Sequence, residues 1–254
     1  MFQRSLWRTH HRVALVAGAL LAMALPAANL CAGGYNPSAP AFIDLYQAFN
    51  DNYKQALLAT HQRNKEKTWS ELMGTRVAWQ MLTRQYHDAP PSAYRKDRLW
   101  KRDLDAISTG ISTAVTQAEA GDLAGAHEAL EPIRHIWLQI RERNDVRWFG
   151  DQLTKFHDVM EPAVQAAIAG VTEENLAGFQ KRVDAVSTSW QGVLGFKHDP
   201  RSKERRRLLA DMLAAETQAI GNLRSAVEAR DYPNLKPLAQ AVQKSYAALY
   251  LAFG

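Results

Sequence analysis

Four side chains near the middle of the sequence have the types and spacing of a metal site. Glu131 and His135 stand four residues apart, and so do His157 and Glu161, in the reverse order. Residues four apart share one face of an α-helix, so each pair presents an imidazole beside a carboxylate. Two imidazoles and two carboxylates form a ligand set for a divalent transition metal such as zinc, copper or iron.

The quartet converges if the two helices that carry it form an antiparallel hairpin that turns near residue 146. At equal distances from that turn, Glu131 faces Glu161. By the same rule His135 faces His157. Each glutamate is followed directly by a proline, and a proline inside a helix frees a carbonyl group and bends the helix. The register therefore predicts two carboxylates at one level of the hairpin and two imidazoles at another.

A solvated polar face is the alternative interpretation of these residues. At about 100° per residue, His135 lies opposite the apolar stripe of its own helix. His157 and Glu161 lie on the flank of theirs, where polar pairs four residues apart are common. A metal or ligand site, a solvated face and a catalytic role all stay open at this stage, with His127 and Asp158 as further candidate ligands.

The elements that must position these residues are predicted to be helices throughout. Strong helix formers dominate the chain, and no run of alternating β-branched residues occurs. Prolines follow His87-Asp88 and His198-Asp199 closely, and proline cannot continue a helix. Apolar residues recur every three or four positions, which favours amphipathic helices packed as up-down bundles. Eight helices are expected near residues 39–58, 61–86, 97–120, 123–144, 147–169, 173–196, 203–229 and 232–252.

The two halves of the chain align with each other at an offset of 107 to 111 residues. The pattern predicts an all-α protein made by tandem duplication of an antiparallel four-helix unit, with unit 1 over residues 41–145 and unit 2 over 146–254. Matched pairs include Phe42 and Phe149, Phe49 and Phe156, Trp79 and Trp190, His87 and His198, and Asp122 and Asp231. The shared tryptophans and histidines are interpreted as core and helix-end residues. The counterparts of the quartet are Gln240, Lys244, Asn50 and Lys54, so the quartet is not shared scaffold.

The N-terminus predicts export. Three arginines precede a 13-residue apolar run at 13–25, which small residues and a proline then end. That is the layout of a signal peptide, and the run is shorter than the roughly 20 residues of a membrane span. Residues 1–32 are therefore expected to be removed, with Ala28 as the alternative last residue of the signal peptide. Residues 33–40 are expected to form a flexible N-terminal segment, and the protein to be periplasmic or secreted.

Net charge and cysteine content limit the kinds of partner that the chain is expected to bind. Removal of residues 1–32 leaves 28 basic and 26 acidic residues, a net charge of +2, which argues against nucleic-acid binding. The single cysteine, Cys31, excludes an intramolecular disulfide and offers only an imperfect lipidation signal. Contact with a membrane is therefore expected only through the signal peptide or through lipidation at Cys31.

Several chemistries lack their sequence signatures. The chain contains no C-x-x-C-H, which excludes covalent c-type haem. It also contains no H-E-x-x-H, no G-x-S-x-G and no glycine-rich phosphate loop. The sequence thus predicts, as the leading hypothesis, a non-enzymatic, exported binding protein, with a metal ion at the junction of the two units as its candidate ligand. The alternative is a structural or protein-interaction module without a small-ligand site and with an unidentified protein partner.

Overall fold

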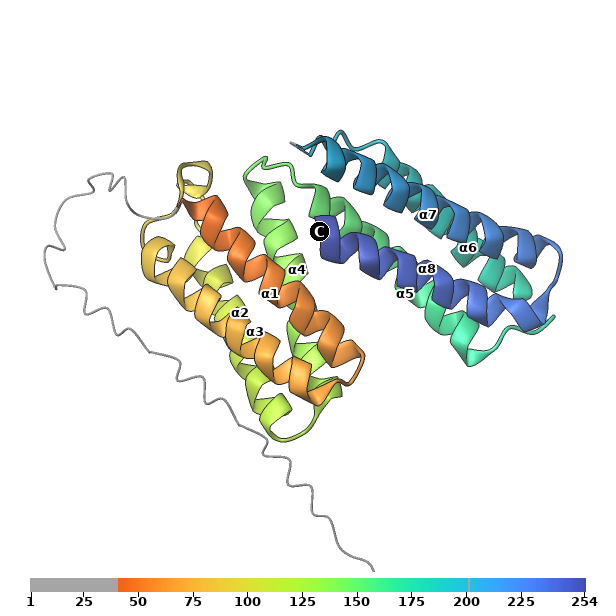
Figure 1. Ribbon diagram of the computed structural model, residues 1–254, viewed down its shortest axis with the longest axis horizontal. Helices are drawn as coiled ribbons and strands as arrows, with labels where there is room; N and C mark the ends of the chain where they lie inside the picture. The colour runs from red at the N-terminus through yellow and green to blue at the C-terminus, as the bar shows by residue number, and fades with distance from the viewer. Residues whose placement is uncertain (1–40, 201) are drawn as a thin grey trace, which may run out of the picture. The chain divides into compact units, whose positions relative to one another are not determined.

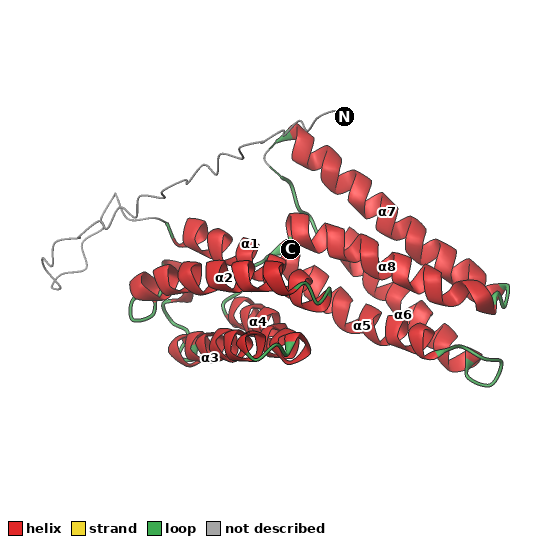
Figure 2. Ribbon diagram, turned by 60° about the horizontal axis from the view of Figure 1, so that its bottom comes forward, coloured by secondary structure: helices red, strands yellow, loops and turns green. Residues whose placement is uncertain are grey.

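The protein is helical wherever the structure describes it. The computed structural model describes residues 41–254 except 201, so the predicted signal peptide (1–32), the segment 33–40 and Cys31 lie outside the described residues. That part contains eight α-helices, a 3-10 turn at Ser92–Tyr94 and no strand (Figures 1 and 2). The helices are α1 Phe42–His61, α2 Lys65–Tyr86, α3 Trp100–Glu119, α4 Leu123–Arg143, α5 Phe149–Ala169, α6 Leu176–Leu194, α7 Lys203–Glu228 and α8 Tyr232–Phe253. The all-α prediction and its eight helices are confirmed.

The helix boundaries have local chemical causes. The side chains of Asn64, Asp122 and Ser202 each accept a hydrogen bond from a backbone N–H in the first turn of α2, α4 and α7, which satisfies one of the unpaired donors at a helix start. Gly170 ends α5 with a φ of 109°, a conformation that a residue without a Cβ adopts at little cost. The stops and starts are therefore encoded within a few residues of each turn.

The helices pack as two closed rings of four. In the first ring α1 contacts α2, α2 contacts α3, α3 contacts α4, and α4 returns to α1; α5 to α8 repeat this order. Contacts of α1 with α8 and of α4 with α5 join the rings, and the described residues form one compact unit. A helical bundle is therefore the architecture. The tandem duplication stays a prediction from the sequence.

Aromatic side chains fill the interior of each ring. Trp137 is 2% exposed and its ring packs against those of Tyr46, Trp79 and Trp100 at centroid distances of 4.8, 6.2 and 6.2 Å. In the second ring Phe156 is fully buried; it lies against Trp190 and Tyr246. Trp79 and Trp190, the tryptophans shared by the two halves and predicted to be core, are both buried. Trp69 of α2 is the described tryptophan that is most exposed, at 43%.

A buried ion pair holds the turn between α4 and α5. The Nε of Arg141 donates to both carboxylate oxygens of Asp151 at 3.0 and 2.9 Å, and its Nη2 donates to Oδ1 at 2.6 Å. Its Nη1 donates to the hydroxyl of Tyr46 on α1 at 2.8 Å. All three side chains are buried, so this contact ties α1, α4 and α5 together beside the junction of the rings.

Candidate functional site

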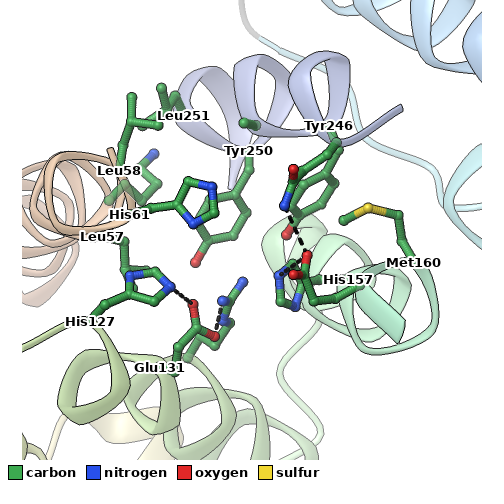
Figure 3. A pocket seen from close by; sticks show the side chains of 15 residues that line it. Leu57, Leu58, His61, His127, Glu131, His157, Met160, Tyr246, Tyr250 and Leu251 are labelled. Carbon is green, nitrogen blue, oxygen red and sulfur yellow. Dashed lines mark hydrogen bonds and ion pairs between the residues drawn. The ribbon is translucent and has the colours of Figure 1, made fainter. Parts of the chain in front are cut away.

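A cavity of about 310 Å³ lies where α1, α4, α5 and α8 meet. Figure 3 shows the imidazoles of His61, His127 and His157 around this space, with the rings of Tyr246 and Tyr250 on its far side. Much of the remaining wall is apolar. The residues that line the cavity are Lys54, Leu57, Leu58, His61, His127, Glu131, Arg134, His157, Met160, Glu161, Gln243, Tyr246, Ala247, Tyr250 and Leu251.

Three of the four predicted site residues line this cavity. They are Glu131 from α4 and His157 and Glu161 from α5. The fourth, His135, is not part of the lining: its Nε2 lies 2.8 Å from Oδ1 of Asp158. That carboxylate stands between the two imidazoles, because the Nδ1 of His157 lies 3.9 Å from the same oxygen. His135 therefore pairs with Asp158, where the hairpin register predicted His157.

The physical reason is the way α4 and α5 pack. Near the turn they run side by side and antiparallel, as the Arg141–Asp151 pair and the 2.7 Å contact between Lys155 and Glu142 demonstrate. Beyond the turn each helix directs its apolar stripe into its own ring, so α4 packs mainly on α3 and α1, and α5 mainly on α6 and α8. Across the junction of the rings, α4 and α5 therefore contact each other only through the polar side chains beside their apolar stripes.

Glu131 is held as an anion inside the cavity wall. Its carboxylate accepts a hydrogen bond from the guanidinium of Arg134 and lies 3.2 Å from Nε2 of His127. Burial by itself would raise the pKa of Glu131, but the contacts with His127 and Arg134 outweigh burial and hold it well below its usual range. The other carboxylate of the cavity, Glu161, accepts from the amides of Gln165 at 2.6 Å and Gln243 at 3.1 Å.

The imidazoles differ in how strongly the protein engages them. His127 is used on both nitrogens, since its Nδ1 lies 3.0 Å from the hydroxyl of Thr60 and its Nε2 faces Glu131. The ring of His157 lies 5.5 Å from that of Tyr246, centroid to centroid, and its nitrogens lie 3.8 and 3.9 Å from the carboxylates of Glu161 and Asp158. Burial, followed by the neighbouring charge of His127, lowers the pKa of His61. His157 and His61 are therefore less closely engaged by the described residues than His127 is.

Buried polar groups form the inner side of the cavity. Arg134 is 6% exposed, and its guanidinium carbon lies 5.7 Å from the ring centroid of Tyr250. Its Nε and the hydroxyl of Tyr246 have no hydrogen-bond partner among the described residues. Lys54 is 4% exposed and donates to the carbonyl oxygen of Gly254 at 3.0 Å. Two buried cations and two carboxylates thus face one small space.

The arrangement is not a preformed metal centre. Within residues 41–254, apart from 201, no group of three or more His, Cys, Asp and Glu side chains is placed to hold a metal ion. Glu131 already binds Arg134, and His135 already binds Asp158. A metal ion at the predicted quartet would require these pairs to open, and the metal hypothesis stays a prediction.

Sequence reasoning missed several residues of the cavity. His61 and Leu58 come from α1, about 70 residues before Glu131 in the chain, and no local pattern links them. Arg134 had a usable signal, because a cation three residues after a glutamate lies on the same helix face. The burial of Arg134 could not be predicted from the sequence, because charged residues are rarely buried inside a bundle.

No helix of the described chain is both long and apolar enough to cross a membrane. Comparisons with known protein families, with curated proteins and with solved structures find no match to this chain.

Proposed function

We propose that the chain is an exported binding protein whose small ligand occupies the cavity between α1, α4, α5 and α8. The observation that carries this proposal is the cavity itself, where three imidazoles, two carboxylates and two buried cations stand among apolar side chains. Binding sites of this kind are typically apolar clefts with a few polar groups that orient the ligand. The predicted signal peptide supports a location outside the cytoplasm.

The wall chemistry favours an organic ligand with an apolar body and one polar end. Leu57, Leu58 and Leu251 lie toward one side in Figure 3, with the methionine Met160 on the other. The volume of about 310 Å³ falls at the lower end of the roughly 300–1,000 Å³ of small-molecule sites. The weakly engaged imidazole of His157 is placed to hydrogen-bond the polar end.

A metal ion is the second candidate ligand, and the long contacts of the His157 nitrogens favour it. This imidazole comes no closer than 3.8 Å to either neighbouring carboxylate, so a metal ion would displace only long contacts. Glu161 on the same helix face would be the adjacent ligand. His135 and Glu131 would complete the predicted quartet after release of their present partners.

Binding of a fluorescent apolar probe tests the cavity directly. Anilinonaphthalene sulfonate should bind the purified protein, and Leu58→Trp, which fills the cavity from a half-buried position on α1, should abolish that binding. The control Leu194→Trp alters a side chain on α6 that is 41% exposed and outside the cavity. Equal probe binding by all three proteins would contradict the proposal.

Elemental analysis and titration with Zn²⁺ and Cu²⁺ test the metal hypothesis separately. His157→Ala should weaken metal affinity if this imidazole is a ligand, and His135→Ala should weaken it further if the full quartet forms. If no metal co-purifies, and the double variant keeps both its metal affinity and its melting temperature, the metal site is refuted while the organic-ligand proposal stands.

A further inference from the structure

A stripe of exposed apolar side chains follows one face of α2. Trp69, Val77 and Met81 are 43%, 55% and 53% exposed, and half-buried Met73 lies between them at the same four-residue spacing. Single exposed apolar residues are ordinary, but a contiguous patch on one helix marks an interaction surface. We call these four residues the α2 stripe.

Of the α2 stripe, Met73 packs against the core of its own ring, whereas Trp69, Val77 and Met81 are exposed. In the alignment of the two halves, Trp79 of α2 corresponds to Trp190 of α6, and both are buried. At the same offset the α2 stripe corresponds to Gln180, Asp184, Thr188 and Gly192. Helix α6 of the other ring therefore has polar or small residues where α2 is apolar. This difference indicates that α2, and not α6, contacts a partner.

The α2 stripe is complementary to itself. If a second α2 is laid antiparallel, with the two-fold axis at the level of Thr75, Trp69 meets Met81 of the other copy. Met73 then meets Val77 in the same way. At about 100° per residue, the four residues span an arc of only about 120°. A single helix face can thus bury its full apolar stripe against an identical face.

The charges at the two ends match in the same register. Glu66 and Arg84 lie on the centre line of this face, equally far from Thr75, and both are exposed. Neither forms an ion pair within the part of the chain that the structure describes. In the antiparallel arrangement each Glu66 faces Arg84 of the other copy, so the dimer contains this pair twice.

We propose that two copies of this chain associate through antiparallel contact of their α2 helices. A two-fold contact uses the same patch on both subunits and must be self-complementary. Here apolar residues meet apolar residues, and opposite charges meet at both ends. Binding of a different helix would not require the apolar and charged residues of α2 to be spaced symmetrically on either side of Thr75. A second copy of the chain does require this symmetry, so it is the partner that the pattern supports.

Sedimentation velocity over a range of protein concentrations tests this dimer. The wild-type protein should show monomer and dimer in a concentration-dependent equilibrium, and Val77→Glu should weaken the dimer at least tenfold by placing two carboxylates in the interface. Val77 is 55% exposed, so the variant should keep its helical circular dichroism. The matched control is Thr188→Glu at the corresponding exposed position of α6, which should leave the dimer unchanged.

Charge exchange tests the register. Glu66→Arg alone and Arg84→Glu alone should each weaken association by about tenfold, because each places two like-charged pairs in the dimer. The double variant should recover most of the wild-type affinity. A wild-type protein that stays monomeric up to its solubility limit would overturn the proposal. A double variant whose loss of dimer affinity equals the summed losses of the two single variants would also overturn it. Binding of wild-type monomers to anionic lipid vesicles through Val77 would also overturn it.

Discussion

The buried carboxyl group of Glu216 should make the stability of this protein fall as pH rises. Glu216 lies on α7 and is 0% exposed. One carboxyl oxygen accepts a hydrogen bond from the hydroxyl of Ser245 on α8, and the other has no partner in the described structure. Among residues 41–254, apart from 201, no cation contributes to its electrostatics. In the alignment of the two halves its counterpart is Ile107, which is also fully buried.

The magnitude follows from the pKa. Burial raises the pKa of Glu216 to about 8, against 4.5 for an ordinary glutamate, although the hydrogen bond from Ser245 acts in the other direction. Below pH 4.5 the group is neutral in the folded and the unfolded chain. Between pH 4.5 and about 8 only the unfolded chain loses the proton, so this group lowers the free energy of unfolding by about 1.4 kcal/mol per pH unit. The loss reaches up to about 5 kcal/mol near pH 8.

Glu216→Gln removes this ionisation while keeping the size and polarity of the side chain. Its stability should match that of the wild type near pH 4.5 and exceed it by several kcal/mol near pH 8. Urea unfolding at a series of pH values, followed by helical circular dichroism, measures both curves. The difference between them isolates Glu216, because every other titrating group is common to the two proteins.

A pH-independent difference between the two curves would refute this reasoning. It would mean that Glu216 ionises in the folded protein as readily as in the unfolded chain. Glu204→Gln provides the control, since Glu204 lies on the same helix but is exposed. That variant makes the same chemical change at a position that is not buried, so it separates the effect of burial from that of the substitution itself.

Three further substitutions test the packing and the cavity. Arg141→Ala leaves the carboxylate of Asp151 buried without its cation, so urea unfolding should show a loss of about 3–5 kcal/mol; a loss below about 1 kcal/mol would show that the pair is not buried as described. Phe156→Ala empties a fully buried position and should cost about 3–5 kcal/mol, whereas Leu194→Ala, at a 41% exposed position, should cost far less in the same assay. Glu131→Gln should destabilise the protein by about 1–3 kcal/mol at neutral pH. Because the folded pKa of Glu131 is depressed, this difference should shrink as pH falls below 4.5, and a difference that grew on acidification would reverse the assigned direction.

The eight helices could be predicted because their causes are local. Apolar residues recur with the helical period, and prolines, glycines and capping side chains stand at the ends. The observed α4 and α5 begin and end within two residues of the expected ranges 123–144 and 147–169. The 3-10 turn at Ser92–Tyr94 was missed, since it lies in a proline-rich connection without a periodic pattern.

The candidate site was predictable only in part. Comparison of the two halves singled out Glu131, His157 and Glu161, and all three line the cavity. The partner of His135 was not predictable, because it depends on how far α4 and α5 diverge after their turn. His61 reaches the same cavity from α1, and no spacing rule brings a residue so distant in the chain to this place.

Helical period and turn chemistry were enough to specify which segments are helices and which faces they bury, because both act over a few residues. The closing of two rings, and the cavity left where α1, α4, α5 and α8 meet, depend on contacts between segments that are far apart in the chain. Burial also assigns chemical character that residue type alone does not carry. Glu131 is held as an anion by a neighbouring cation, while Glu216 of the same residue type is held neutral by its apolar surroundings.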